Sequence, residues 1–350
     1  MSPFPTPSVM RPEESAPWTS EHTGVAVTRM ADFALDEALT RALRQAAPAL
    51  RRRRVTLTVD SRWGPACACG DAQAVEADLR CVLDALAQEL ADGVLAVRAS
   101  CTAIQRRWRC TVDLAVAGPA IDGEVVEAVM RRLALEEDVS PGGSLLHRAR
   151  GHCPRTGAAL HLGGLAGHGL CLKFQLMLPM VPSTVAHPEM DAGRTRAWVL
   201  DADPCNGPLL AWQLQQLGWV TWQFRTTAQA MRRALALHAA QAGPALVLAV
   251  ESPEVSLASL VTLATRLPLP TCCVLGILPG EAAWPAVAAS GAVQTSLWPF
   301  SHADLVAFTA RASGLAEADM ATTTVPRPLR RTPGTASPPH PDDSPGASTR

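Results

Sequence analysis

The sequence is poor in several residue types, and these shortages exclude classes of function. Lysine occurs only at Lys173 and tyrosine is absent, a bias that we attribute to a GC-rich genome. The 31 basic residues, nearly all of them arginine, are balanced by 32 acidic residues, which gives a net charge of −1. A chain so close to neutrality offers no electrostatic reason to expect binding to nucleic acid or to a membrane surface.

Long apolar runs and metal-binding spacings are also missing. No run reaches the roughly 18 apolar residues that a membrane-spanning helix needs, and the start MSPFPTPSVMRPEES has neither the basic residues nor the apolar core of a signal peptide. We therefore expect a cytoplasmic protein whose ten cysteines are reduced. Neither the C-x-C of Cys67 and Cys69 nor the adjacent Cys272 and Cys273 has a second pair at zinc-like spacing, so we expect no metal site and no cofactor.

The length of 350 residues and the hydrophobic fraction of 48% indicate a globular chain of about two domains. Stretches rich in Pro, Ser and Thr divide it. The predicted division is a disordered arm over 1–28, a first domain over 29–182, a polar linker over 183–195, a second domain over 196–314 and a disordered tail over 315–350.

The strongest helix pattern in the first domain is GDAQAVEADLRCVLDALAQEL, residues 70–90. Apolar residues recur there at three- and four-residue steps, which predicts one buried face, and Asp71 can accept the free N–H groups of the first turn. Further helices are predicted over 31–47, 123–133 and, as a short element, 140–149, and strands over 55–60, 93–101, 106–116 and 170–179. Helices mixed with hairpin strands predict an α/β sandwich.

This order resembles the ATPase domain of histidine kinases, as do the frame of Leu79, Arg80, Val82 and Leu83 and the closing strand KFQLMLPM. A kinase of that family also has a phosphorylatable histidine on a two-helix hairpin. Only His22 precedes the first domain here, inside the Pro-rich arm, so we expect no autophosphorylation of the usual kind.

The resemblance implies a nucleotide site whose ligands are substituted. Two asparagines that serve magnesium and phosphates in the family fall on Ala85 and Glu89, and the aspartate that binds the adenine amino group falls on Val116. The phosphate-cradling glycine loop is matched only by Gly142 and Gly143, with broken spacing. Each lost charged hydrogen bond costs about 1.5–3 kcal/mol. We therefore expect no ATP binding at physiological concentrations and no nucleotide-binding residues.

The second domain alternates strands and helices. Five strands, including RAWVL, PALVLAV and CCVLGI, are separated by predicted helices that include 281–290 and 301–312. This alternation predicts a doubly wound five-stranded parallel sheet with the flavodoxin-like fold. The motifs VLDADPCNG, GPALVLAVESPEV and SGAVQTSLWPF resemble those of response-regulator receiver domains.

A receiver needs an aspartate nucleophile, acids for magnesium, a Thr or Ser, and a Lys. The matching positions are Ala249 for the nucleophile, Leu275 for the hydroxyl and Trp298 for the Lys, so no catalytic residue is expected. Of the acids, Asp201 remains beside Ala202.

Asp203 and Glu251 complete a residual acidic pocket with Asp201. Asp203 is expected to cap the helix that begins at Pro204. Glu251 is expected to be a solvent-facing loop acid, with mimicry of a phosphorylated state as the alternative.

The two resemblances together imply a bacterial, catalytically inactive relative of hybrid histidine kinases that regulates phosphorelay signalling through protein contacts. The implied partner is a histidine kinase, a response regulator or a phosphotransfer protein, and a homodimer stays open. The candidate contact residues, most of them expected in the core, are Phe300, Leu305, Val306, Phe308, Trp212, Trp219 and Trp222. Two alternatives remain: a divergent but active ATP-binding hybrid sensor kinase, and a scaffold or transcription cofactor outside phosphorelay.

Overall fold

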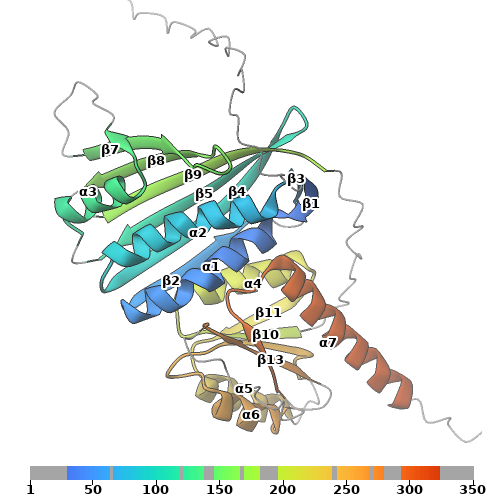
Figure 1. Cartoon of the computed structure of the whole chain (residues 1–350). Helices are drawn as coiled ribbons and strands as arrows, with labels where there is room; N and C mark the ends of the chain where they lie inside the picture. The colour runs from blue at the N-terminus through green and yellow to red at the C-terminus, as the bar shows by residue number, and fades with distance from the viewer. Residues whose placement is uncertain are drawn as a thin grey trace, which may run out of the picture.

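A computed structural model describes residues 30–63, 66–118, 121–137, 146–165, 169–181, 196–238, 243–267, 271–279 and 293–323. The predicted arm over 1–28, the linker over 183–195, the helix over 281–290 and the glycines Gly142 and Gly143 lie outside these residues. Figure 1 shows two halves in contact, each built on one main sheet.

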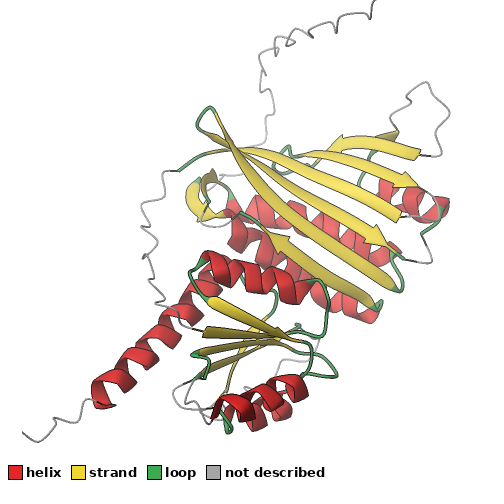
Figure 2. Ribbon diagram, turned by 180° about the vertical axis from the view of Figure 1, so that it is seen from behind, coloured by secondary structure: helices red, strands yellow, loops and turns green. Residues whose placement is uncertain are grey.

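The N-terminal half is built on a mixed seven-stranded sheet in the order β2-β4-β5-β9-β8-β7-β6. Its strands are β2 (Val55–Ser61), β4 (Gly93–Ile104), β5 (Arg107–Ala117), β6 (Glu136–Glu137), β7 (Leu146–His152), β8 (Ala159–Leu165) and β9 (Gly169–Pro179). Helices α1 (Leu35–Arg52), α2 (Ala72–Glu89) and α3 (Gly123–Arg132) lie on one face of this sheet, and no described element covers the other face (Figures 1 and 2). This layering is the α/β sandwich that the sequence predicts.

The buried face of α2 follows the predicted apolar spacing. Leu79, Leu83 and Leu86 are almost completely buried, and the Asp71 carboxylate accepts the Ala74 N–H at 2.9 Å, as expected of a helix N-cap. These leucines belong to the same core cluster as the buried leucines of α1, so the two helices share one apolar layer above the sheet.

Two predictions for this half are wrong. Residues 31–34 do not begin a helix but form β1 (Ala31–Ala34), which pairs with β3 (Cys67–Gly70). Residues 146–149, expected in a short helix, belong to β7, where exposed Arg148 and Arg150 alternate with buried Ala149. Pairing with β8 satisfies the backbone of this segment, and the tertiary context overrides its weak helical pattern.

The C-terminal half contains five parallel strands in the order β11-β10-β12-β13-β14. They are β10 (Arg196–Leu200), β11 (Val220–Phe224), β12 (Leu246–Val250), β13 (Cys272–Ile277) and β14 (Val293–Leu297). The described helices are α4 (Asn206–Gln216), α5 (Thr227–His238), α6 (Leu257–Ala264) and α7 (His302–Thr323). The strand order is that of the flavodoxin-like doubly wound fold, so the predicted fold class is confirmed.

Helix α7 is longer than expected. The predicted end at Ala312 is overrun by three turns, to Thr323, so part of the segment assigned to a disordered tail is helical. Among the described helices, none is both long enough and apolar enough to cross a bilayer.

The two halves meet where β2, the edge strand of the large sheet, faces α4. The Asn206 side-chain Nδ2 donates to the Leu57 carbonyl oxygen at 3.1 Å, and its Oδ1 accepts the Val59 N–H at 3.2 Å. One amide side chain therefore pairs with two backbone groups of β2 on the side that β4 leaves open.

Helix α1 makes a second set of contacts between the halves. Arg44 donates to the carbonyl oxygens of Leu297 and Pro299 and to the Asp304 carboxylate, at 2.9, 3.1 and 2.7 Å. Asp36, which is almost fully buried, accepts the Ser61 hydroxyl and the His302 backbone N–H. The bond from Ser61 stays within the N-terminal half, and the others join α1 to β14, to the turn after it and to the start of α7.

Candidate functional site

The carboxyl edge of the five-stranded sheet carries the positions at which a receiver would handle phosphate. Ala249 lies beside Leu200 of β10 and beside Leu275 of β13 in the strand register. Ala249 and Leu275 are both completely buried. Neither side chain can attack phosphorus or donate a hydrogen bond, so this part of the edge has no nucleophile.

Asp201 is the acid that remains at this edge, directly after β10. Its side chain is 5% exposed, and its Oδ1 accepts the Asp203 backbone N–H at 2.8 Å. Its Oδ2 is buried and has no hydrogen-bond partner among the described residues. Burial raises the pKa of Asp201 to about 7; the bond from Asp203 lowers this pKa, and the Asp203 charge raises it.

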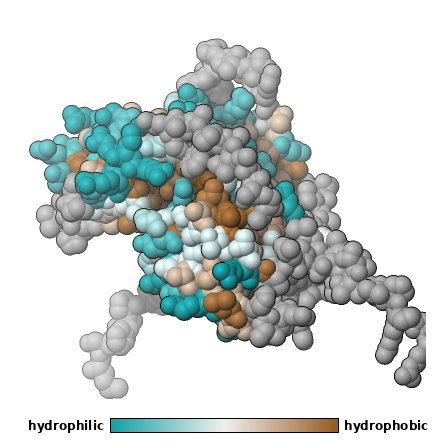
Figure 3. Space-filling model, turned by 90° about the horizontal axis from the view of Figure 1, so that it is seen from below, coloured by the Kyte–Doolittle hydropathy of each residue, from teal (hydrophilic) through white to brown (hydrophobic). Residues whose placement is uncertain are grey.

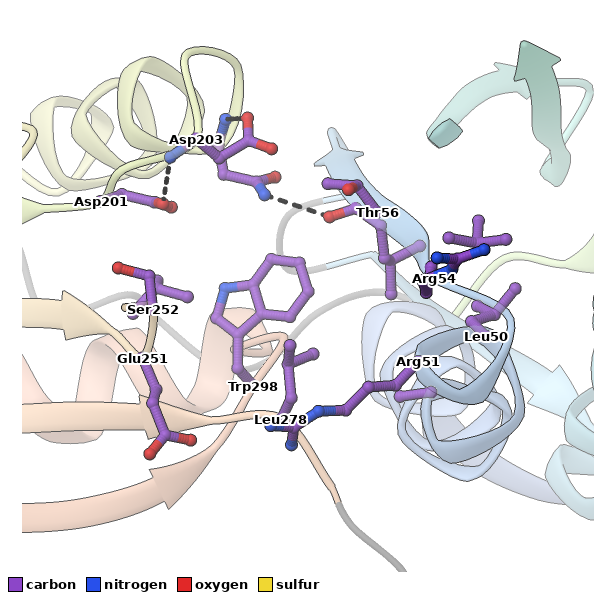
Figure 4. Close-up of a pocket in the computed structure, with 15 residues that line it drawn as sticks. Leu50, Arg51, Arg54, Thr56, Asp201, Asp203, Glu251, Ser252, Leu278 and Trp298 are labelled. Carbon is purple, nitrogen blue, oxygen red and sulfur yellow. Dashed lines mark hydrogen bonds between the residues drawn. The ribbon is translucent and has the colours of Figure 1, made fainter. Parts of the chain in front are cut away.

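Asp203 and Glu251, the other two acids of the expected pocket, line the same cavity, but their carboxylates do not act together with that of Asp201. Asp203 Oδ1 accepts the backbone N–H groups of Cys205 and Asn206 at 2.7 and 3.1 Å, and so binds the turn that leads into α4, which begins at Asn206 and not at the expected Pro204. Figure 4 shows the Glu251 carboxylate directed away from Asp201. Among the described residues no group of three His, Cys, Asp or Glu side chains could hold a metal ion.

The N-terminal half forms one wall of the cavity at this edge. It has a volume of about 290 Å³ and lies between the end of α1 and the loops that follow β10, β12, β13 and β14. Trp298, at the position of the receiver Lys, is buried and projects into it, while Arg51 and Arg54 come from the opposite wall (Figure 4). The expected acidic pocket is thus a mixed site to which both halves contribute.

Two of the three positions matched to nucleotide ligands, Ala85 and Glu89, lie on α2. Ala85 lines an open groove of about 550 Å³, and Glu89 forms an ion pair with Arg132, which lines the same groove. Val116 lies buried on β5 and is not among the residues that line this groove. The structure therefore places Ala85 in this groove, links Glu89 to it only through the ion pair with Arg132, and leaves Val116 apart from it.

The groove contains three arginines, and each faces an acid. Besides the pair of Arg132 with Glu89, Arg80 lies 3.4 Å from the Asp84 carboxylate, and Arg155 lies 3.8 Å from that of Asp78. Their positive charges are compensated within the protein. A phosphate would have to compete with these carboxylates for them.

The candidate residues for partner contacts differ in exposure. Phe300, Leu305, Phe308 and Trp219 are buried, as expected for most of this set, and Val306 is half-buried. Trp212 is 38% exposed and has the Arg62 guanidinium 5.5 Å from its ring centre, so it takes part in the contact between halves. Trp222 is half-buried beneath Arg233, at 4.1 Å.

Sequence reasoning missed the residues that join the halves. Asn206, Arg44 and Asp36 make their contacts across 147 to 266 positions of the chain, and no local pattern encodes such pairs. A signal existed only for Asp36, since an acid next to Leu35 on the apolar side of a helix calls for a buried partner.

No family model matches the sequence, and no curated protein matches it. Several solved structures align with part or most of the chain. Full-length ShkA in complex with AMPPNP has 13% sequence identity and a TM-score of 0.45, and the match covers 81% of this chain and 57% of that one. The solved structures that match parts of this chain include histidine kinases.

Other histidine kinase structures give shorter matches. The nucleotide-free catalytic domain of histidine kinase ThkA has 10% identity and a TM-score of 0.29, over 44% of this chain and 99% of that one. Acinetobacter baumannii histidine kinase AdeS has 12% identity and a TM-score of 0.27, over 43% and 68%. The present chain spans a little over half the length of ShkA, and the fold of each half is defined by its own strand order.

Proposed function

We propose that this protein is a regulatory relative of hybrid histidine kinases that has lost phosphate chemistry and acts in two-component signalling through protein contacts. Its partner is a histidine kinase, a response regulator or a phosphotransfer protein. The observation that supports this most is the row at the carboxyl edge, where Ala249, Leu275 and Trp298 stand in place of a nucleophile, a hydroxyl and an ammonium. Phosphoryl transfer depends on such groups to attack phosphorus and to neutralise developing charge.

The surface of the C-terminal half offers places for a partner. Val220, Leu235 and Leu297 are 46%, 59% and 43% exposed, and Figure 3 shows hydrophobic surface in the middle of the lower face among hydrophilic and neutral areas. Apolar side chains in a polar surround are a common feature of contact sites. The start of α7 is less accessible, because Arg44 and Asp36 already bind it.

Labelling experiments test the loss of chemistry. The full chain is incubated with radioactive ATP and, separately, with radioactive acetyl phosphate, and we expect no labelled protein in either case. Calorimetric titration with ATP is expected to show no low-micromolar binding, since the arginines of the α2 groove are paired. A labelled band, or low-micromolar affinity for ATP, would establish the alternative of a divergent ATP-dependent kinase.

Affinity purification at native expression, followed by mass spectrometry, tests the partner. We expect a histidine kinase, a response regulator or a phosphotransfer protein to be recovered. Adding the purified chain to that kinase is then expected to change its rate of autophosphorylation or phosphotransfer. Glu251→Ala serves as the test of phosphate mimicry, because partner binding should be unchanged if Glu251 is a plain loop acid.

A further inference from the structure

The cavity between the two halves has features of a ligand site that neither phosphate-handling resemblance assigns. It lies at the point of the five-stranded sheet where the strand order reverses, between β10 and β12. Ligands of open α/β sheets bind outside the carboxyl ends of the strands at such a point. Its volume of about 290 Å³ is at the lower limit for small-molecule pockets, which suits a compact ligand.

One end of the cavity calls for a hydrogen-bond donor. Asp201 lines the cavity and is 95% buried, and its Oδ2 has no hydrogen-bond partner among the described residues. A buried carboxylate oxygen without a partner is unfavourable, and a charged donor would relieve this. The described residues provide no three-acid cluster for a metal ion, and we take the donor to be an organic cation.

The middle of the cavity is apolar. Figure 4 shows the Trp298 indole between Asp201 and the α1 wall, and Leu50, Leu57 and Leu278 line the same space. A hydrated metal ion gains nothing from such walls. A flat organic body gains contact with the ring, and an attached cation is attracted to the ring face.

The α1 end of the cavity carries positive charge. The Arg51 side chain reaches from α1 toward Leu278, and it has no side-chain hydrogen bond or ion pair with another described residue (Figure 4). Arg54 is engaged by Asp92 at 2.7 Å, so Arg51 is the guanidinium available to a ligand. Guanidinium groups bind carboxylates and phosphates through paired N–H bonds.

We propose that this cavity binds a small organic zwitterion, with its cationic nitrogen at Asp201, its body against Trp298 and its carboxylate or phosphate at Arg51. Such a ligand touches both halves at once, so its binding stabilises their contact. This proposal is independent of the partner proposed above, because it concerns a small molecule and a site inside the chain.

The test uses the full chain and matched probes in calorimetry. The zwitterions are para-aminomethylbenzoate, γ-aminobutyrate and phosphoethanolamine; benzylamine and benzoate each keep one end of the first. At about pH 8, where Asp201 is ionised, para-aminomethylbenzoate should bind at least about tenfold more tightly than benzylamine or benzoate. Comparison of γ-aminobutyrate with phosphoethanolamine decides between carboxylate and phosphate.

Three variants locate the binding. Asp201→Asn should reduce the affinity for para-aminomethylbenzoate to that for benzoate, and Arg51→Gln should reduce it to that for benzylamine. Arg53→Gln is the control, because Arg53 lies on the same helix end but outside the cavity lining. Toward about pH 6 the preference for the amine should fall, since Asp201 then takes up a proton.

Three results would overturn the proposal. The first is failure of all three zwitterions to bind at millimolar concentration. The second is zwitterion binding that Asp201→Asn and Arg51→Gln leave unchanged. The third is binding of Mg²⁺ alone, lost in Asp201→Asn, with no binding of the organic probes.

Discussion

Replacing Asn206 by Ala tests whether one side chain holds the two halves together. The substitution removes the bonds to the Leu57 carbonyl and the Val59 N–H, and Asn206 itself is 5% exposed. Each backbone group left buried without a partner costs about 1–3 kcal/mol. Because there are two such groups, and water can reach the site in part, we expect a loss of about 3 kcal/mol in the free energy of unfolding.

The assay is equilibrium unfolding in urea, followed by circular dichroism and tryptophan fluorescence. Gln215→Ala is the matched control. Gln215 also lies on α4, but its bond goes to the Thr221 hydroxyl within the C-terminal half and is exposed, so its loss should cost less than about 0.5 kcal/mol.

Asn206→Asp adds a second comparison. It keeps an acceptor for Val59 but sets a carboxylate against the Leu57 carbonyl oxygen, so it should be at least as destabilising as Asn206→Ala. The wild-type chain should unfold in one transition and the Asn206 variants in two, one for each half. A loss below about 1 kcal/mol, or one equal to that of Gln215→Ala, would refute the assignment of Asn206 as the joining residue.

Three further substitutions probe other features. The pKa of Asp201 is raised from 3.8 to about 7, so the contribution of this group to stability is complete below about pH 4 and is lost as the pH rises through 7. Asp201→Asn should therefore be more stable than wild type at about pH 8, by up to about 4 kcal/mol in urea unfolding. At about pH 4 the two proteins should be equally stable. A constant difference at all pH values would contradict this. Arg44→Ala removes three hydrogen bonds, one of them to Asp304, and should lower the free energy of unfolding by about 2–3 kcal/mol. An unchanged melting temperature would contradict this. Gly276→Ala places a Cβ 2.6 Å from the Phe300 ring, so thermal unfolding should show a loss of about 1–3 kcal/mol, and full stability would show that the ring can move aside.

Much of the fold could be predicted because local pattern and burial agree. The apolar spacing of residues 70–90, with the carboxylate of Asp71 at its start, is enough to define α2 and its buried face. The continuous apolar runs of β12 and β13 likewise indicate strands covered on both faces, and both are fully buried.

The predictions failed where residues distant in the sequence decide the local secondary structure. Residues 31–34 became a strand only because residues 67–70 lie beside them, and residues 146–152 only because β8 pairs with them. The cavity could not be predicted for the same reason, because its walls come from distant parts of the chain. The sequence places Asp201, Asp203, Glu251 and Trp298 at one sheet edge, but only the tertiary structure brings Arg51 to the same space and turns the acids apart.

The position of α4 against β2 also concerns solubility. An edge strand with free N–H and carbonyl groups is a template on which a second chain can add a strand and start aggregation. Here the amide of Asn206 occupies two of those groups. Cutting the chain between its halves would therefore release an N-terminal fragment in which the edge of β2 is exposed. Such a fragment would be prone to self-association however well its own core is packed.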